Sequence, residues 1–578
     1  MKSENTMPRI KVQPIDVTIE AREGETLRDI LLRRGINVES PCNGNGLCGS
    51  CGVWITEHES VPYTPNEHVS ESDLEKGYRL TCMVIPEQDM TIKLSMNFVR
   101  DAKIFRESQT ILEGELAPTY RLVSAVKVLD HQNTTEFIYD NFPEAQALNI
   151  WEDDYEPKGL AIDLGTTTIV VTLVSLKTGV ELATASRLNP QINFGHDVMT
   201  RIQHGSTQEG LHELAESVRK GINELIHEVC VDSESKRQEI LDVVVGGNTT
   251  MLQILAEIDP APLGAIPFTV DIKTGISYPV NQFGIRINPT GRVYIAPVLH
   301  AFIGSDISAG LLIHSDFFDD TKSVLFVDVG TNGEIALNFF GRRLACSAAA
   351  GPAFEGMGLS CGMRASFGAI ESVSTNGQKI LLSTVGNAPP RGICGSGIVD
   401  LVAALLRLGV IDQTGRYCSL PCAELPVAAR SRLREIEGQT AFILGRDIAF
   451  TQRDVRQVQL AKGAVRAAID VLMDEAGCRV EDLDSIIIAG GFGFYLDPEN
   501  LETIGIIPKG TKDRVEFAGN ACRSGCVWML TDISYRRFLE TCIQDIEHVS
   551  VAQSPKFMEL YAESMEFSGI ETESASCD

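Results

Sequence analysis

The sequence predicts an α/β multidomain protein in which a small cysteine-bearing domain precedes a larger domain of two related lobes. Three observations support this prediction. The chain has 578 residues, which is enough for three or more domains. Three cysteines lie within a glycine-rich stretch at 41–52, and a fourth follows at Cys82. A strand, a Gly-Thr turn and a second strand are predicted at 160–173, and the same pattern recurs at 324–337.

The composition excludes several classes of function. The hydrophobic fraction of 44% is that of a globular protein. A formal net charge of −28 favours solubility and repels nucleic acid and anionic membranes, so we expect neither as a partner. The first seven residues have no apolar core, and no run reaches the roughly eighteen apolar residues of a membrane span. We therefore expect a cytoplasmic protein, in which the scattered cysteines are reduced thiols.

The N-terminal cysteines follow the pattern of an iron–sulfur site. Cys42, Cys48 and Cys51 read C-x5-C-x2-C, and Cys82 follows about thirty residues later. Plant-type [2Fe–2S] ferredoxins use C-x4-C-x2-C…C, and the longer first gap resembles the adrenodoxin-like branch. The glycines between the cysteines let backbone N–H groups point at the sulfurs. We expect these four thiolates to hold one [2Fe–2S] cluster.

Other uses of the cysteines stay open at this point. A structural zinc site favours two C-x2-C pairs, whereas this stretch has one. A disulfide requires an oxidising compartment. Elsewhere, two pairs with x3 spacing leave a second metal site open: Cys418 with Cys422, and Cys522 with Cys526.

The segments around the cysteines predict a β-grasp ferredoxin-like domain at 1–95. Strands are expected at 15–19 and 90–94, and a short amphipathic helix at 26–32 precedes the cysteine loop. Residues 96–157 are predicted to form a linker and a small connecting element, with a strand at 122–129. A linker matters because a cluster that visits two partners needs reach.

Three motifs organise the remaining part of the chain, at 158–578. The first two motifs are the repeated pattern, in which a buried strand carries Asp163 or Asp328 near its end and a Gly-Thr turn follows. The third, at 486–493, is a buried strand that runs into Gly490 and Gly491. In this order they resemble the two phosphate motifs and the adenosine motif of the actin, sugar kinase and Hsp70 superfamily. The alternative is a duplicated α/β domain with tight hairpins and no nucleotide.

The resemblance implies an actin/sugar kinase/Hsp70-like (ribonuclease H-like) ATPase domain, with lobe one at about 158–320 and lobe two at about 321–578. Asp163 and Asp328 would hold Mg²⁺ through water, and Glu334 would orient the attacking water. Backbone N–H groups and hydroxyls would bind ATP. The expected nucleotide-binding residues are Gly165, Thr166, Thr167, Gly330, Thr331, Asn332, Gly490 and Gly491.

A long helix is predicted before the third motif. Thr451 and Asp454 form a capping-box start, an apolar stripe follows at helical spacing, and Gly477 suits the C′ position. In Hsp70-like proteins the corresponding helix carries a lysine to the nucleoside. That resemblance implies a nucleotide-binding role for Lys462 and its neighbour Gln459; the alternative is a solvated helix lysine.

Two glycine-rich stretches, at 348–358 and 391–400, have two interpretations. Each could allow a helix to pack closely on a sheet, or it could form the edge of a site where a bulky flat cofactor approaches the backbone. Ser396 lies between two glycines at a predicted helix start, and we expect its hydroxyl to point outward toward such a cofactor.

The combination of these domains resembles the reductive activators of corrinoid proteins. The resemblance spans nearly the whole chain and is most specific at 454–464 and 489–493. It implies an ATP-dependent iron–sulfur reductase that returns inactive cobalt(II) to cobalt(I) in anaerobic methyl transfer. The implied partners are a corrinoid protein and a low-potential donor such as a ferredoxin or flavodoxin, and a homodimer stays open. One departure is expected: the family's middle domain is often larger than the roughly sixty residues that join the parts here.

Three alternatives belong to other classes. An activator of a radical dehydratase has the same fold but carries its cluster cysteines within the lobes. A sugar or acid kinase with a redox sensor would phosphorylate a small molecule. A non-catalytic binding module would use nucleotide only to control docking.

Overall fold

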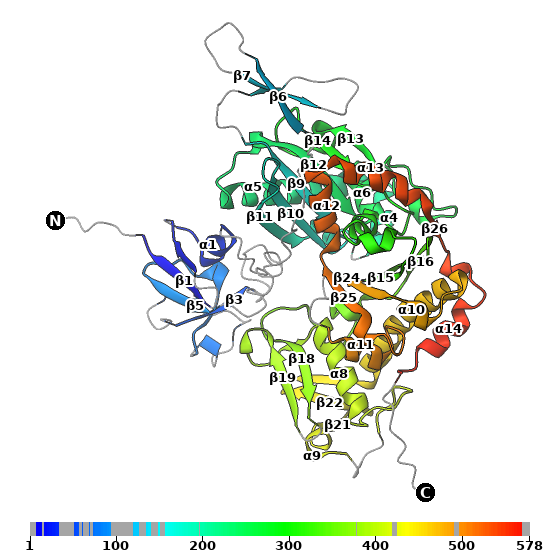
Figure 1. The fold of residues 1–578 in the computed structure, drawn as a ribbon. Coiled ribbons are helices and arrows are strands. Elements are labelled where there is room, and N and C mark those ends of the chain that lie inside the picture. Colours follow the sequence, from blue (N-terminus) through cyan, green and yellow to red (C-terminus); the bar gives the residue numbers. More distant parts are fainter. Residues whose placement is uncertain are drawn as a thin grey trace, which may run out of the picture.

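Two six-stranded sheets form the centre of the structure, which is a computed structural model (Figure 1). The structure describes the following residues: 7–13, 17–22, 24–33, 51–56, 61, 69, 73–74, 76–93, 120–126, 134–139, 148–150, 156–195, 197–376, 379–418, 425–490 and 496–568. Within this part of the chain, no helix is long and apolar enough to cross a membrane.

The N-terminal domain has one five-stranded sheet with helix α1 packed on it. Its strands follow the order β2-β1-β5-β3-β4, and β1 pairs in parallel with β5. The elements are β1 (Arg9–Gln13), β2 (Val17–Glu20), α1 (Leu27–Arg33), β3 (Gly52–Ile55), β4 (Tyr78–Leu80) and β5 (Met90–Lys93). The predicted helix and the last strand are confirmed within about one residue. The strand predicted at 15–19 is shifted to β2, and β1 was not predicted.

A small antiparallel sheet joins the two large parts of the chain. Its strands are β6 (Tyr120–Val126), β7 (Thr134–Tyr139) and β8 (Leu148–Ile150), in the order β6-β7-β8. Figure 1 shows this sheet projecting from the first lobe. The connecting element therefore has three strands where the sequence predicted one.

The two central sheets share the arrangement of five of their six strands. The first has the order β11-β10-β9-β12-β14-β13, and the second has the order β25-β24-β15-β16-β17-β26. In each, an antiparallel three-stranded meander is extended by parallel strands next to its first strand. Their bounds are β9 (Lys158–Leu164), β10 (Thr168–Ser175), β11 (Glu181–Leu188), β12 (Ile240–Gly247), β13 (Ile276–Pro279), β14 (Arg292–Ile295), β15 (Ser323–Val329), β16 (Gly333–Phe339), β17 (Arg342–Ala348), β24 (Ser485–Ala489), β25 (Val515–Gly519) and β26 (Ile546–His548). The duplication predicted from the repeated pattern is confirmed.

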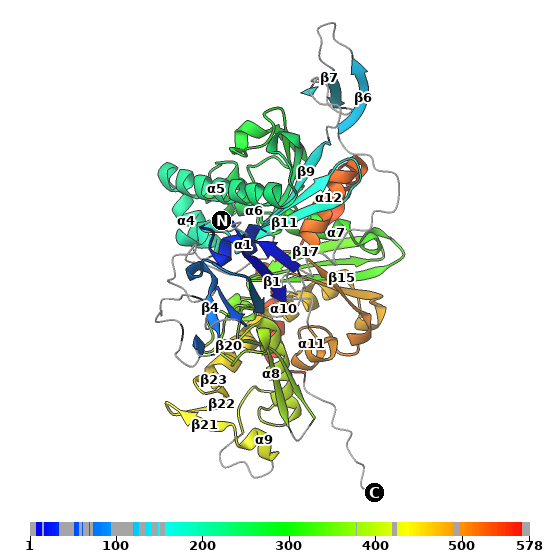
Figure 2. The ribbon, with the colours of Figure 1, turned by 90° about the vertical axis from the view of Figure 1, so that its left-hand side faces the viewer.

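Helices cover both faces of each sheet, and α7 packs between the two sheets (Figure 2). Apolar side chains of α5 and α6 bury one face of the first sheet. Those of α8, α10 and α11 bury the outer face of the second. The helices are α4 (Val198–Gly205), α5 (Gln208–Asp232), α6 (Thr249–Leu255), α7 (Ser305–Leu312), α8 (Gly395–Arg407), α9 (Val427–Arg430), α10 (Gln452–Ala476), α11 (Pro498–Ile504), α12 (Ala521–Thr531), α13 (Ile533–Cys542) and α14 (Phe557–Ser564).

Helices α12 and α13 return to the first sheet, although they belong to the range predicted as lobe two. Arg523 in α12 pairs with Glu181 at 2.6 Å, and Arg536 in α13 pairs with Asp242 at 2.5 Å. Both arginines are buried. A buried charge is stable only with such a partner, so these pairs define where the helices dock.

Two smaller sheets extend the second lobe. One has the order β19-β18-β20 and the other the order β21-β22-β23. Their strands are β18 (Ala369–Thr375), β19 (Ile380–Thr384), β20 (Gly392–Ile393), β21 (Leu433–Ile436), β22 (Gln439–Gly445) and β23 (Ile448–Thr451). Figure 1 shows β18 and β19 on the side of the lobe that faces the N-terminal domain.

Helix α10 confirms the predicted helix in full. Thr451 is its N-cap and forms a capping box with Asp454, and Gly477 ends it with a φ of 73°. A residue with a Cβ is strained at that φ, so glycine is the natural terminator.

Candidate cluster and nucleotide sites

The N-terminal sheet brings two of the predicted cluster cysteines together. Cys51 directly precedes β3, and Cys82 lies in a 3-10 turn (Thr81–Met83) after β4. Their Sγ atoms are 3.2 Å apart, well beyond the S–S bond of about 2.05 Å. The backbone N–H of Thr81 donates to the carbonyl of Cys51 and aligns the two segments. Cys42 and Cys48 lie outside the described residues.

The chemistry of this pair fits a metal cluster. The hydrogen bond with Cys82 lowers the pKa of the Cys51 thiol to about 6, against the opposing effect of burial. The thiolate is the form that binds iron. Two convergent sulfurs, one of them readily ionised, are suitable ligands for a [2Fe–2S] cluster.

The cysteine domain contacts the second lobe through an aromatic cluster. Tyr78 lies against Gly52, the residue after Cys51, where a Cβ would come within 1.9 Å of the tyrosine ring. The Tyr78 ring stacks on Phe367 with ring centroids 4.9 Å apart, and Trp54 packs on the same phenylalanine at 5.8 Å. Arg391 donates to the Tyr78 hydroxyl at 3.4 Å. Phe367 is 5% exposed and belongs to the hydrophobic core of the cysteine domain.

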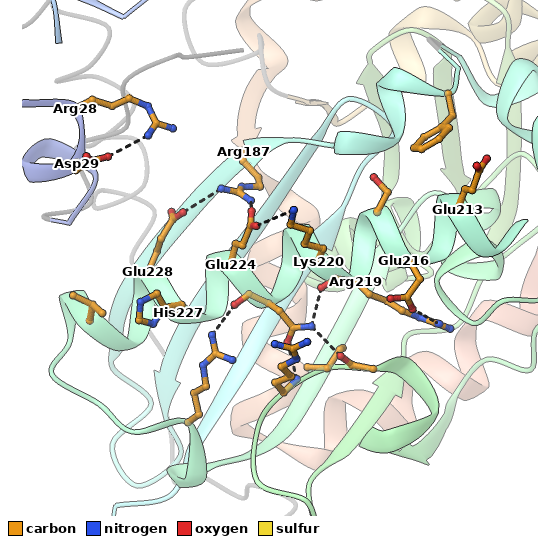
Figure 3. Close-up of a pocket in the computed structure, with 18 of the residues that line it drawn as sticks. Arg28, Asp29, Arg187, Glu213, Glu216, Arg219, Lys220, Glu224, His227 and Glu228 are labelled. Atoms are coloured by element: carbon orange, nitrogen blue, oxygen red, sulfur yellow. Dashed lines mark hydrogen bonds and ion pairs between the residues drawn. The ribbon is translucent and has the colours of Figure 1, made fainter. Parts of the chain in front are cut away.

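A second contact between the domains is electrostatic. A groove of about 1430 Å³ separates α1 from α5 and is lined by side chains of both signs (Figure 3). Arg28 of α1 faces the first lobe. There, Glu228 forms an ion pair with Arg187, with a distance of 3.3 Å between the charged atoms. Burial raises the pKa of Glu228, and the charges of Arg187 and Arg28 oppose that effect. The groove contains none of the phosphate-motif residues, so it is a space between domains and not the nucleotide site.

The two predicted aspartates lie near the ends of equivalent strands and face each other across the lobes. Asp163 is on β9 and accepts a hydrogen bond of 2.8 Å from Asn520, the N-cap of α12. Asp328 is on β15, opposite Glu334 on β16. A third aspartate, Asp306, lies in the first turn of α7. No pattern in the sequence indicated Asp306 or Asn520 as site residues.

These carboxyl groups raise one another's pKa. Burial raises the pKa of Asp328 to about 7, with further contributions from Asp306 and Asp163. Burial and the charge of Asp163 likewise raise the pKa of Asp306 to about 7. The pKa of Glu334 is raised well above its usual value by burial, Asp306 and Asp328. Like charges held this close favour a cation among them.

The donor set suits a hydrated Mg²⁺. Carboxylate oxygens are the ligands that a hard cation prefers, and Mg²⁺ usually keeps several of its waters. Among the described residues, no three acidic, histidine or cysteine side chains converge closely enough to hold a bare ion. Asp163 and Asp328 would hold such an ion through its waters, and the ion would neutralise phosphate charge there.

The turns after the two strands have the form expected of phosphate-binding loops. The N–H of Gly165 donates to the carbonyl of Thr168 at 3.0 Å, and a Cβ at Gly165 would lie 2.9 Å from that oxygen. Asn189 donates to the Gly165 carbonyl at 2.9 Å and supports the turn. Gly490 has a φ of 99°, and a Cβ there would lie 2.7 Å from Asp328 Oδ1. Thr166, Thr167, Gly330 and Asn332 are partly exposed in these turns; Gly491 lies outside the described residues.

Gln459 and Lys462 are engaged by the C-terminal segment. Gln459 donates to the carbonyls of Thr414 and Met565, at 3.1 and 2.9 Å. Lys462 is 1% exposed, donates to the carbonyl of Glu566, and lies 5.3 Å from the ring centre of Phe567. The solvated-lysine alternative is therefore wrong. A nucleoside contact by either side chain stays a prediction.

The Lys462→Met variant should change the pH dependence of stability. Burial lowers the pKa of Lys462 to about 7, so between about pH 7 and 10.5 the unfolded chain binds the extra proton and stability rises with pH. From pH 7 to 9 we expect wild type to gain on the order of 2 kcal/mol from this residue. Urea unfolding at both pH values measures the gain, which K462M should lack. The exposed Lys177→Met control should keep it; an equal gain in K462M would contradict the prediction.

The Ser396 hydroxyl does not point outward as predicted. Ser396 lies in the first turn of α8 and is 8% exposed, and its hydroxyl donates to the carbonyl of Glu371 at 2.8 Å. Gly397 allows the close approach of α8 to β18, since a Cβ there would lie 2.2 Å from the Ile370 carbonyl. The close-packing interpretation of this stretch is thus confirmed. A contact between Ser396 and a cofactor stays a prediction that requires this bond to break.

The fold and the two sites define a class of protein: a two-lobed ATPase of the actin type that carries its own iron–sulfur domain. Comparison with known families agrees with this class. The family described as "2Fe-2S iron-sulfur cluster binding domain" matches residues 10–87. "RACo middle region" matches 158–316, and "C-terminal domain of RACo the ASKHA domain" matches 322–576. The prediction of a reduced middle domain is wrong, because the family's middle region corresponds to the first lobe.

Individual relatives extend the match to the whole chain. The chain is 37% identical to the corrinoid activation enzyme RamQ of Eubacterium limosum, over 96% of this chain and 98% of that protein. It is 27% identical to the [Co(II) methylated amine-specific corrinoid protein] reductase of Methanosarcina barkeri, over 63% of this chain and 68% of that protein. A solved structure, "Reductive activator for corrinoid,iron-sulfur protein", superposes with a TM-score of 0.70 at 30% identity and covers 97% of this chain and 98% of its own.

The chain belongs to the family of reductive activators of corrinoid proteins, which are ATP-dependent iron–sulfur enzymes.

Proposed function

We propose that this protein couples ATP hydrolysis to the one-electron reduction of a corrinoid protein, from inactive cobalt(II) to cobalt(I), in a cytoplasmic methyl-transfer system. The electron comes from a low-potential ferredoxin or flavodoxin and passes through a cluster held by Cys42, Cys48, Cys51 and Cys82. Mg·ATP binds between Asp163 and Asp328. A homodimer is compatible with this function and is not required by it.

The observation that carries the proposal is the contact between the cysteine domain and the ATPase lobe. Tyr78 touches the residue next to Cys51 and also stacks on Phe367 of the second lobe. A movement of that lobe would thus act on the segment that holds a cluster ligand. The segment that contains β6–β8 separates the two domains in sequence. The contact between them is therefore noncovalent and could form and break without a change in the covalent chain.

The coupling has a thermodynamic reason. The [2Fe–2S] cluster supplies one electron at a potential of roughly −400 mV in plant-type proteins. Cobalt(I) requires a lower potential, and each ~59 mV uphill costs a factor of ten for one electron. ATP hydrolysis supplies free energy if the two lobes bind the corrinoid partner differently before and after hydrolysis. Methylation then removes the cobalt(I) product.

An anaerobic visible spectrum tests this function. A corrinoid protein in the cobalt(II) state is mixed with this protein, a low-potential reductant and Mg·ATP. We expect the cobalt(I) spectrum to appear only when all components are present. Equal reduction without ATP would contradict the coupling, and phosphorylation of a small molecule without cobalt reduction would favour the redox-sensing kinase.

Division of the chain near Glu152 should separate the two activities. The N-terminal piece should still accept electrons, and the C-terminal piece should still bind ATP. An equimolar mixture should form cobalt(I) far more slowly than the intact chain, because the effective concentration of the tethered domain, on the order of 1 mM, is lost. Initial rates at micromolar protein measure the difference. If the N-terminal piece alone reduces the corrinoid protein as fast as the whole chain, the ATPase domain has another purpose.

A further inference from the structure

The stretch at 348–358 contacts the second phosphate loop. The N–H of Gly351 donates to the carbonyl of Thr331 at 2.9 Å. The Thr331 hydroxyl donates to Glu355 Oε1 at 2.6 Å. The Thr331 hydroxyl thus donates its proton to a carboxylate, and a contact from this hydroxyl to a phosphate oxygen stays a prediction that requires this bond to break.

Glu355 is held rigidly at this place. It ends a 3-10 helix (η8, Pro352–Glu355) in which Ala353 and Phe354 are buried in the core of the second lobe. Gly356 follows with a φ of 73°, and a Cβ there would lie 2.2 Å from the Met363 carbonyl. A side chain at the next position would not fit, so the backbone around Glu355 has little freedom.

One oxygen of Glu355 lacks a partner. Glu355 Oε2 is buried and accepts no hydrogen bond from any residue that the structure describes. The other oxygen, Oε1, is the one that lies near the phosphate loop, since a Cβ added at Gly330 would find it at 4.0 Å and Asn332 O at 3.6 Å. Leaving a buried oxygen unsatisfied costs about 1–3 kcal/mol. A hydrogen-bond donor that reached Oε2 would remove that cost.

We propose that Glu355 is a catalytic residue of the ATPase reaction, in which its carboxylate accepts a hydrogen bond from the water that attacks the terminal phosphate while Thr331 donates to its Oε1. This inference rests on ATP binding at the proposed site. In the step, the water oxygen forms a bond to the γ-phosphorus, the bond to the bridging oxygen breaks, and ADP leaves with the electron pair. The water proton passes to Glu355 and then to solvent.

Glu334, the residue predicted for this role, lies on β16 directly after the same loop and is hydrogen-bonded by the side chain of Asn332. It is paired across the hairpin with Asp328, and burial together with the charges of Asp306 and Asp328 raises its pKa. Glu355 instead approaches the loop from the stretch after β17. Both glutamates therefore contact the second phosphate loop, and the water-orienting role of Glu334 stays a prediction.

The Glu355→Gln variant tests the inference, because glutamine keeps an oxygen for the Thr331 hydroxyl and replaces the other oxygen with a donor. The purified holoprotein is assayed for ATP hydrolysis, for affinity toward a non-hydrolysable ATP analogue, and for its Mg²⁺ requirement. We expect kcat to fall about 100-fold, with KM, analogue affinity and half-saturating Mg²⁺ within about threefold. Glu435→Gln, on an exposed position of β21, should match wild type.

Each other outcome overturns the inference. An unchanged kcat removes Glu355 from the chemistry. Recovery of kcat at high Mg²⁺ assigns Glu355 to the metal. Loss of analogue binding in both Glu355→Gln and Glu355→Asp makes it a structural support of the loop. A wild-type protein that binds ATP and never hydrolyses it contradicts the proposed function instead, before any variant is compared.

Discussion

The Cys51→Ala variant is expected to lose its iron–sulfur cluster and all reduction of a corrinoid protein. Cys51 and Cys82 present sulfurs 3.2 Å apart, and a [2Fe–2S] cluster needs four protein ligands. Without Cys51, one iron keeps a single thiolate and the cluster is lost. Iron content should fall from about two per chain to almost none, and the visible absorption should disappear with it.

The same variant should keep its ATPase site. The interacting carboxylates between the lobes, which are Asp163, Asp306, Asp328 and Glu334, include no residue of the cysteine domain. ATP binding measured alongside iron content therefore separates loss of the cluster from general unfolding. Cys542→Ala in α13 is a matched control that should retain iron. Stoichiometric zinc in the wild-type protein, or a coloured C51A variant that still forms cobalt(I), would contradict the cluster assignment.

The Asp328→Asn variant is expected to abolish ATP hydrolysis and, with it, ATP-dependent reduction. Asparagine keeps the shape of the side chain but removes a charge that a hydrated Mg²⁺ would neutralise. We expect hydrolysis to fall by at least about 100-fold, the size of effect seen when one electrostatic contact to a transition state is removed. The visible spectrum of the cluster should be unchanged.

Two comparisons make this prediction specific. Asp513→Asn changes the same group at an exposed position after α11 and should leave hydrolysis intact. Extra Mg²⁺ should not rescue D328N if the residue also positions the phosphate loop. Hydrolysis at the wild-type rate in D328N would show that the nucleotide binds elsewhere.

Helix α10 and the two hairpins could be predicted because their signals are local. The capping box of Thr451 with Asp454 and the terminator Gly477 lie within or next to the helix that they define. The turns that follow Asp163 and Asp328 join adjacent strands. Local hydrogen bonds and a two-residue or 3.6-residue period decide these elements.

The site itself could be predicted only in part. The strand-end aspartates stand in a repeated pattern, so one copy supports the other. Asp306 and Asn520 belong to no such pattern. The structure identifies them as site residues because α7 and α12, which are distant in sequence, bring them close to Asp163. Glu355 lies in the glycine-rich stretch at 348–358, whose two sequence interpretations were close packing and the edge of a cofactor site.

The sequence by itself determined the order of the domains, the duplication of the lobes and the chemistry of the cysteines. Each follows from spacing within one segment. Tertiary structure alone decided that α12 returns to the first sheet, where Asn520 meets Asp163 across 357 positions. It also turned the Ser396 hydroxyl toward Glu371 and placed Glu355 on the phosphate loop. Such contacts join segments that are far apart in the sequence. They depend on which buried apolar faces pack together and which buried charges are paired, and the packing of the whole chain determines both.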